Sequence, residues 1–151
     1  MRIRLFSGPI LVALLVALGA VLAPGRVSSA ETPAFVVIVH PQSPYRALER
    51  SFVAEAFLKK STRWPSGDVI KPVDLPPNSR TRERFSQDVL RRSVSAVRSY
   101  WQQIIFSGRD VPPPELANDD VVVKYVETHP GAIGYVFGST HLGATRAVVV
   151  Y

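Results

Sequence analysis

The 151-residue chain has no cysteine, one methionine and only three histidines, and these shortages exclude or disfavour several kinds of chemistry. Without cysteine there is no disulfide, no thiolate nucleophile and no thiolate metal ligand. The histidines, at His40, His129 and His141, are scattered without H-x-x-x-H spacing, which favours turn or surface positions over a metal centre. We therefore expect neither a metal nor a cofactor.

The sequence also has no recognisable catalytic serine. A serine nucleophile of the hydrolase type needs a G-x-S-x-G elbow, and Ser107-Gly108 and Gly138-Ser139 do not match it. Glu49, Glu55 and Glu83 are candidate acid/base groups, but exposed helical carboxylates are usually only solvated. The sequence thus predicts a protein that binds rather than one that makes or breaks bonds, and not an enzyme.

A long uncharged apolar run occurs only near the N-terminus, at residues 10–23. Arg2 and Arg4 precede it, and the small residues Ser28, Ser29 and Ala30 follow it. This order predicts a secretory signal peptide over residues 1–30, cleaved after Ala30, and therefore a periplasmic or secreted protein. The alternative is an uncleaved membrane anchor, but the run is short against the roughly 20 residues of a membrane span.

Charge argues against one class of partner. Three of the eighteen basic residues precede Glu31, so residues 31–151 carry fifteen basic and twelve acidic side chains, a net charge of +3. That balance is ordinary and does not indicate nucleic-acid binding. The basic residues do cluster between positions 80 and 98, which could be a solvated helix face or a ligand site. The members of this cluster are Arg80, Arg82, Arg84, Arg91, Arg92 and Arg98.

The apolar pattern of residues 31–151 predicts a single α/β domain. Residues 35–39 (FVVIV) read as a strand that is covered on both faces, and residues 69–75 read as a second strand. Pro72 lacks an N–H and indicates an edge position or an interruption. Residues 132–137 and 147–151 read as two closing strands. We expect 35–39, 69–75 and 132–136 to lie in one sheet with helices on both sides.

Four helices are predicted between these strands. They cover residues 51–59, capped by Ser51; residues 81–90; a helix capped by Ser93; and a helix capped by Asn118. The third has an apolar stripe, so we expect Trp101 and Ile105 to be largely buried. The fourth should turn Val122, Tyr125 and Val126 inward.

The loop at residues 78–85 (NSRTRERF) carries the strongest functional signal. Asn78 and Ser79 are favoured helix caps, and a helix start leaves backbone N–H groups unpaired beside a partial positive charge. Hydroxyls of Ser79 and Thr81 and a guanidinium of Arg80 or Arg82 would complete an oxyanion site. The sequence therefore predicts an oxyanion site formed by Asn78, Ser79, Arg80, Thr81 and Arg82.

Three segments in order also resemble the phosphate-binding proteins of ABC-type importers. Residues 57–67 (FLKKSTRWPSG) resemble a "FLGK…W…G" segment of that family, 78–85 a "SGTRxxF" loop, and 130–136 (PGAIGYV) a "PGAIGYV" strand. The resemblance implies a three-layer α/β sandwich like one lobe of a type II periplasmic binding protein. One departure is Arg80, which stands where the family has glycine, adding bulk and removing a residue free to adopt positive φ.

Two functions follow from these observations. The resemblance implies an exported solute-binding domain for phosphate or a similar oxyanion, related to ABC-type phosphate transport. The alternative is a ligand-free protein-interaction or accessory domain of the cell envelope, which keeps the fold without the ligand. A binding protein encloses its ligand between two walls, so a single lobe would need a second wall from another copy or a partner protein.

Overall fold

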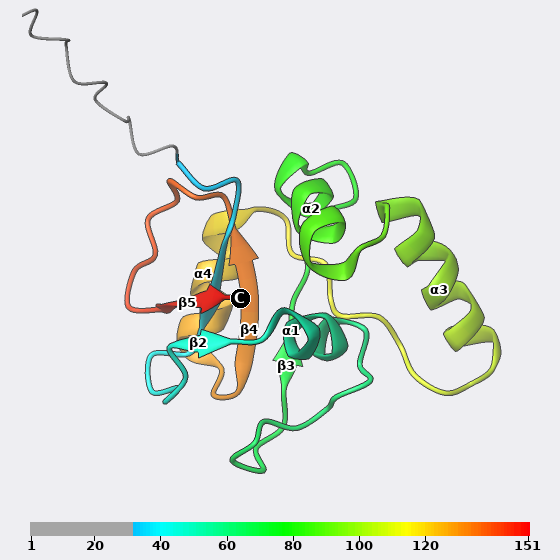
Figure 1. The fold of residues 1–151 in the computed structure, drawn as a ribbon, viewed down its shortest axis with the longest axis horizontal. Helices are drawn as coiled ribbons and strands as arrows, with labels where there is room; N and C mark the ends of the chain where they lie inside the picture. The colour runs from blue at the N-terminus through cyan, green and yellow to red at the C-terminus, as the bar shows by residue number, and fades with distance from the viewer. Residues whose placement is uncertain (1–31) are drawn as a thin grey trace, which may run out of the picture. The chain divides into compact units, whose positions relative to one another are not determined.

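The structure is a computed structural model that describes residues 32–151, which fall within one compact unit. The predicted signal peptide, its cleavage after Ala30 and the alternative membrane anchor lie outside the described residues. Within these residues, the chain forms a mixed sheet with helices on both faces, as the sequence predicts (Figure 1).

Five strands form the sheet, in the order β2-β5-β1-β4-β3. The central strand β1 pairs antiparallel with both β4 and β5, while β2 runs parallel to β5 and β3 parallel to β4. All three strands predicted to share a sheet do so. The strands are β1 (Val36–Val39), β2 (Ala47–Leu48), β3 (Lys71–Pro72), β4 (Ala132–Val136) and β5 (Arg146–Val150).

Strand β3 is shorter than the predicted 69–75, and its brevity has a physical cause. Pro72 has no N–H to donate, so the strand pairs with β4 alone and lies at the edge of the sheet. On either side of the proline, Lys71 N donates to Gly131 O and Val73 N to Ile133 O, both at 3.0 Å. The sequence did not predict β2, whose two residues add the opposite edge.

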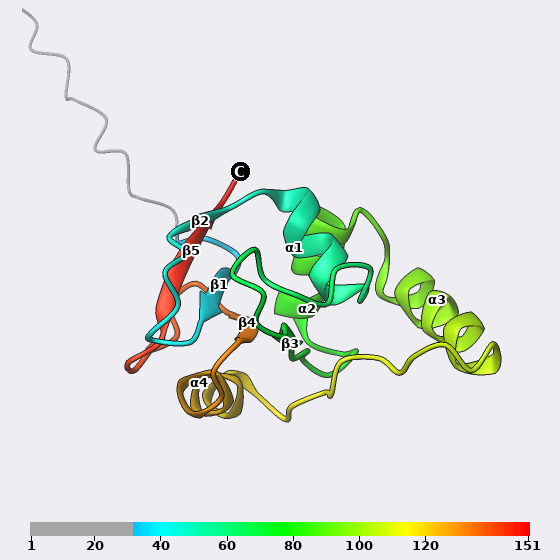
Figure 2. The same ribbon diagram turned by 90° about the horizontal axis from the view of Figure 1, so that it is seen from below.

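Helices cover both faces of the sheet (Figure 2). One face is covered by α4 (Asp119–Thr128), and the other by α1 (Arg50–Phe57) and α2 (Arg80–Phe85). Helix α4 begins as predicted, because Asn118 Oδ1 accepts from Val121 N at 3.0 Å. The predicted Ser51 cap of α1 is wrong: the cap position is two residues earlier, at Glu49, whose side chain makes no capping hydrogen bond.

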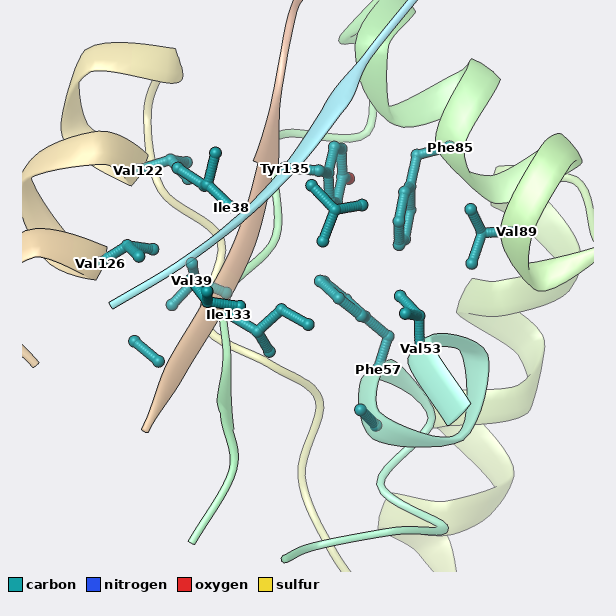
Figure 3. Close-up of a cluster of buried hydrophobic side chains, with 14 of the residues drawn as sticks. Ile38, Val39, Val53, Phe57, Phe85, Val89, Val122, Val126, Ile133 and Tyr135 are labelled. Carbon is teal, nitrogen blue, oxygen red and sulfur yellow. The ribbon is translucent and has the colours of Figure 1, made fainter. Parts of the chain in front are cut away.

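The core is built from aliphatic side chains on one face of the sheet and aromatic rings on the other (Figure 3). Val122 and Val126 of α4 are fully buried on the first face. On the second, Phe85 stacks on Tyr135 with ring centroids 3.8 Å apart and also packs on Phe57. The predicted inward position of Tyr125 is wrong in part, because this side chain is only half-buried and stacks on His129.

The predicted helix over residues 81–90 forms with an altered second half. Helix α2 is α-helical, and the next five residues form a π-helical turn, η1 (Ser86–Leu90). Arg91 then adopts a left-handed conformation, with φ at 55°, and ends the helix. The wider π turn still keeps Val89 and Leu90 buried against the core.

Helix α3 (Val94–Phe106) lies at the margin of the fold in both Figures 1 and 2, away from the sheet. Ser93 caps it as predicted, because its Oγ accepts from Ala96 N at 3.2 Å. Trp101 is buried as expected, with 5% of its surface exposed. The prediction for Ile105 is wrong: it is 49% exposed, because no strand or helix covers the end of α3.

Candidate oxyanion site

The predicted site lies where the chain leaves the edge strand β3 and enters α2. The turn closes through Ser79 N, which donates to Pro76 O at 2.9 Å. Ser79 caps α2 as predicted, because its Oγ accepts from Arg82 N at 3.3 Å and its carbonyl accepts from Glu83 N at 3.0 Å. By helix geometry, the N–H groups of Arg80 and Thr81 are left for a ligand or water.

A pocket of about 610 Å³ opens beside this turn. It lies between the start of α2 and the start of α4, and residues 140–141 close one side. Three of the five predicted site residues line it, namely Asn78, Ser79 and Thr81. The structure therefore brings the amide and hydroxyl groups of the predicted site to one surface.

Arg80 is exposed at the first position of α2. The positive-φ residues other than glycine that the described part of the chain contains are Lys59 and Arg91, so position 80 has ordinary helical backbone. The replacement of the family's glycine by Arg80 thus introduces no backbone strain here. Arg80 is not among the residues that line the pocket.

Arg82 takes a different position, inside the protein. Its side chain is 7% exposed, and its Nη2 lies 3.1 Å from Asp74 Oδ2. Its Nη1 lies 2.5 Å from both Glu115 Oε1 and Leu75 O. Among the buried side-chain nitrogen and oxygen atoms of the described residues, the one without a hydrogen-bond partner is Arg82 Nε. Because Nε is itself buried and both terminal nitrogens are occupied, the main effect of Arg82 on the site is to hold the loop.

Asp74 joins this arginine to the centre of the sheet. Its Oδ1 accepts from Leu75 N at 2.9 Å and from the hydroxyl of Tyr135 on β4. Burial raises the pKa of the Asp74 carboxyl above its ordinary value, and the Arg82 guanidinium opposes that shift. Burial likewise raises the pKa of the Tyr135 hydroxyl, which stays a hydrogen-bond donor. The loop is thereby anchored by a buried polar network.

The far side of the pocket is acidic. Asp119 and Asp120 at the start of α4 both line it. Asp119 Oδ2 accepts from Phe137 N at 3.0 Å and from Thr140 Oγ1 at 2.8 Å, so this carboxylate ties the 137–140 segment to α4. Its charge disfavours an anion on that side. An oxyanion would therefore be best placed against Ser79 and Thr81.

The sequence did not predict Asp74 and Glu115, the two acids that bind Arg82 and thereby hold the loop. An acid inside the apolar run 69–75 was a signal for Asp74, because a buried carboxylate needs a partner. Glu115 had no comparable signal: it comes after a proline-rich connector and reaches Arg82 only through the tertiary fold, beside the bridge that pairs it with Asp74.

Two further features of the described residues bear on function. No helix among residues 32–151 is both long enough and apolar enough to span a membrane. Within the same residues, no group of three or more histidine, aspartate or glutamate side chains is placed to hold a metal ion.

Comparison with known proteins finds its matches among solved structures. No protein-family model matches the sequence, and no curated protein matches it. A phosphate ABC transporter substrate-binding protein from Clostridium perfringens, solved with bound phosphate, is similar with a TM-score of 0.59 at 20% identity. An ABC-type phosphate transport receptor from Vibrio cholerae is similar with a TM-score of 0.60 at 16% identity. PstS from Borrelia burgdorferi is similar with a TM-score of 0.60 at 10% identity.

Each of these matches covers 78% of this chain but only 44%, 46% and 47% of the respective solved chain. The chain therefore spans less than half the length of the proteins it resembles. At these identities the likeness concerns the fold: a mixed α/β sheet with helices that matches one lobe of a type II periplasmic binding protein. The resemblance read from the sequence is confirmed at that level.

Proposed function

We propose that residues 31–151 form an exported solute-binding lobe that takes up phosphate or a similar tetrahedral oxyanion. The observation that carries this proposal is the pocket in which Asn78, Ser79 and Thr81 meet at the start of α2. Proteins with the same fold support it, since two of them are phosphate transport components and one of these was solved with bound phosphate. The proposed activity is binding in support of import, without catalysis.

The groups in this pocket suit a tetrahedral anion. The Thr81 hydroxyl and the free N–H groups at the start of α2 would donate hydrogen bonds, and Arg80, the first residue of that helix, would supply positive charge. One lobe leaves the opposite side of the anion open to water. We therefore expect weak binding, of about millimolar affinity or about −4 kcal/mol, unless a second copy or a partner protein adds the other wall.

Asp119 and Asp120 favour a second candidate, a ligand-free interaction domain of the cell envelope. Both carboxylates line the same pocket and repel a phosphate dianion. The guanidinium of Arg82, which could have offset them, is bound to Asp74 and Glu115. If these charges prevail, the lobe keeps its fold and binds no small anion.

Calorimetric titration of residues 31–151 with phosphate and with sulfate, at two ionic strengths, separates the candidates. The binding proposal expects Thr81→Val to lose most of the affinity, because valine keeps the shape and removes the donor. Thr128→Val is the matched control, since the Thr128 hydroxyl donates to Lys124 O at the opposite end of α4. Absence of binding by the unaltered protein would reject the proposal and favour the interaction domain.

A second pair of variants tests the role of charge. Arg80→Gln should weaken binding, whereas Arg84→Gln should not, because Arg84 is one turn further from the start of α2 and its guanidinium lies 3.8 Å from the Asp88 carboxylate. Equal losses in the two variants would mean diffuse attraction to a basic face. The site at the start of α2 would then be the wrong assignment.

A further inference from the structure

The end of α3 exposes apolar side chains that the proposed oxyanion site does not explain. Phe106 is 90% exposed, Val111 61% and Ile105 49%. We call these three residues the α3 tip; helix α3 itself lies at the margin of the fold in both Figures 1 and 2. The buried side of the helix rests on Val97 and Trp101, so the tip contributes little to the core.

Apart from Asp110, the charged residues next to the α3 tip in the sequence are arginines. No aspartate or glutamate occurs from Val89 to Arg109, a stretch that contains four arginines. Arg98 is seven residues from Ile105, or two helical turns, and so shares its face. The acid nearest in sequence, Asp110, is neutralised by Lys59 Nζ at 3.0 Å. The exposed arginines, none in an ion pair with another described residue, are Arg91, Arg92, Arg98 and Arg109.

This charge pattern argues against a second copy of the chain as the partner of α3. In a two-fold symmetric contact the same patch meets itself. Arg98 would then face a patch whose charged groups are arginines and the carboxylate of Asp110, which Lys59 already neutralises. Burying unpaired like charges is costly, so the surface fits an anionic partner.

The size of the tip favours lipid over an acidic protein. A stable protein interface buries about 800 Å² on each partner, and three protruding side chains provide much less. Lipid needs no complementary shape, and an apolar face flanked by basic residues enters the headgroup region readily. We propose that α3 docks on anionic phospholipid, with Phe106 and Ile105 inserted and Arg98 and Arg109 on the headgroups.

Sedimentation with vesicles tests this surface. Residues 31–151, which fold as one compact unit, should partition onto vesicles of phosphatidylcholine with phosphatidylglycerol and not onto phosphatidylcholine alone. Phe106→Ser should lower partitioning by about tenfold or more. Arg98→Gln should lower it by about fivefold. The matched control is Phe137→Ser, which removes a phenylalanine that is 46% exposed after β4 and should change nothing.

Three outcomes would overturn the proposal. Equal losses of vesicle binding in Phe106→Ser and Phe137→Ser would mean nonspecific adhesion, provided that circular dichroism shows that both variants are folded. Loss of vesicle binding in excess inorganic phosphate at constant ionic strength would show that the headgroups contact the loop at residues 78–82 and not α3. Binding to soluble poly-glutamate without partitioning onto vesicles would assign α3 to an acidic protein partner.

Discussion

Helices α4 and α3 begin with equally clear caps, yet the fold uses them differently. Asn118 and Ser93 each accept a backbone hydrogen bond from the residue three positions on, at 3.0 and 3.2 Å. Helix α4 buries three valines against the sheet, whereas α3 leaves its last two apolar residues in solvent. Local sequence signals therefore determine where a helix begins, while the neighbouring elements determine whether its apolar side is covered.

The neighbours explain the difference. Helix α4 packs closely on β4 because Gly134 has no side chain; a Cβ there would lie 2.7 Å from Val122 Cγ1. Among the described residues, helix α3 packs chiefly on the π-helical turn η1. The described contacts that tie it and its following loop to the α1 end are Tyr100 OH to Leu58 O at 2.9 Å and Lys59 to Asp110. The α4 region is therefore fixed by packing, and the α3 region by few contacts.

The largest expected effect contrasts two arginines of the same sequence cluster. Arg82→Ala should lower the free energy of unfolding by about 3–5 kcal/mol, because it leaves the Asp74 carboxylate buried without its partner. Arg98→Ala, on the exposed face of α3, should change it by less than about 0.5 kcal/mol. Denaturant unfolding of both variants checks this, and similar losses would contradict the buried network.

Truncation within α3 separates its covered side from its exposed side. Trp101→Ala should cost about 3–5 kcal/mol if the site cannot collapse, since only 5% of Trp101 is exposed. Ile105→Ala should cost less than about 0.5 kcal/mol. A loss below about 1 kcal/mol for Trp101→Ala would mean that α3 is not part of the core.

Close packing of α4 on β4 predicts an effect of intermediate size. Gly134→Ala should cost about 1–3 kcal/mol, because the new methyl group collides with Val122. Adding Val122→Ala should relieve part of that collision, so the double variant should be less destabilised than the sum of the two single variants. Simple additivity in denaturant unfolding would show that the close approach is absent.

The smallest effect concerns the ion pair near α3. The hydrogen bond from the Val111 N–H and, to a lesser extent, the contact with Lys59 lower the pKa of Asp110. The ionised carboxylate therefore stabilises the fold at pH values above the ordinary aspartate pKa. This stabilisation is lost as pH falls through the lowered pKa. Asp110→Asn should thus cost less than about 1 kcal/mol near neutral pH and nothing in strong acid. A cost independent of pH would mean that charge plays no part.

Much of the fold could be predicted because its signals are local. The β-branched run at 36–39, the caps Ser79, Ser93 and Asn118, and the strand at 132–136 all form where the sequence places them. Strand β2 could not be predicted, because its two residues form a strand only through pairing with β5. The exposure of Ile105 depends on which elements surround α3, and periodicity carries no such information.

The candidate site was predicted unevenly for a related reason. The turn chemistry of residues 78–81 brings Asn78, Ser79 and Thr81 to one pocket. Nothing in the sequence distinguishes Arg82 from Arg80, two positions away on the same short helix. Burial separates them, because Arg82 faces Asp74 and Glu115 while Arg80 faces solvent. Long-range contacts of this kind appear only in the folded chain.

Amide NMR of residues 31–151 during titration with phosphate tests whether an oxyanion binds at the start of α2. We expect the largest shifts at the N–H groups of Arg80 and Thr81, which helix geometry leaves free there. Sulfate should shift the same signals, and chloride at equal ionic strength should not. Shifts spread over Arg91, Arg92 and Arg98, or no shifts at all, would contradict an oxyanion site in this pocket.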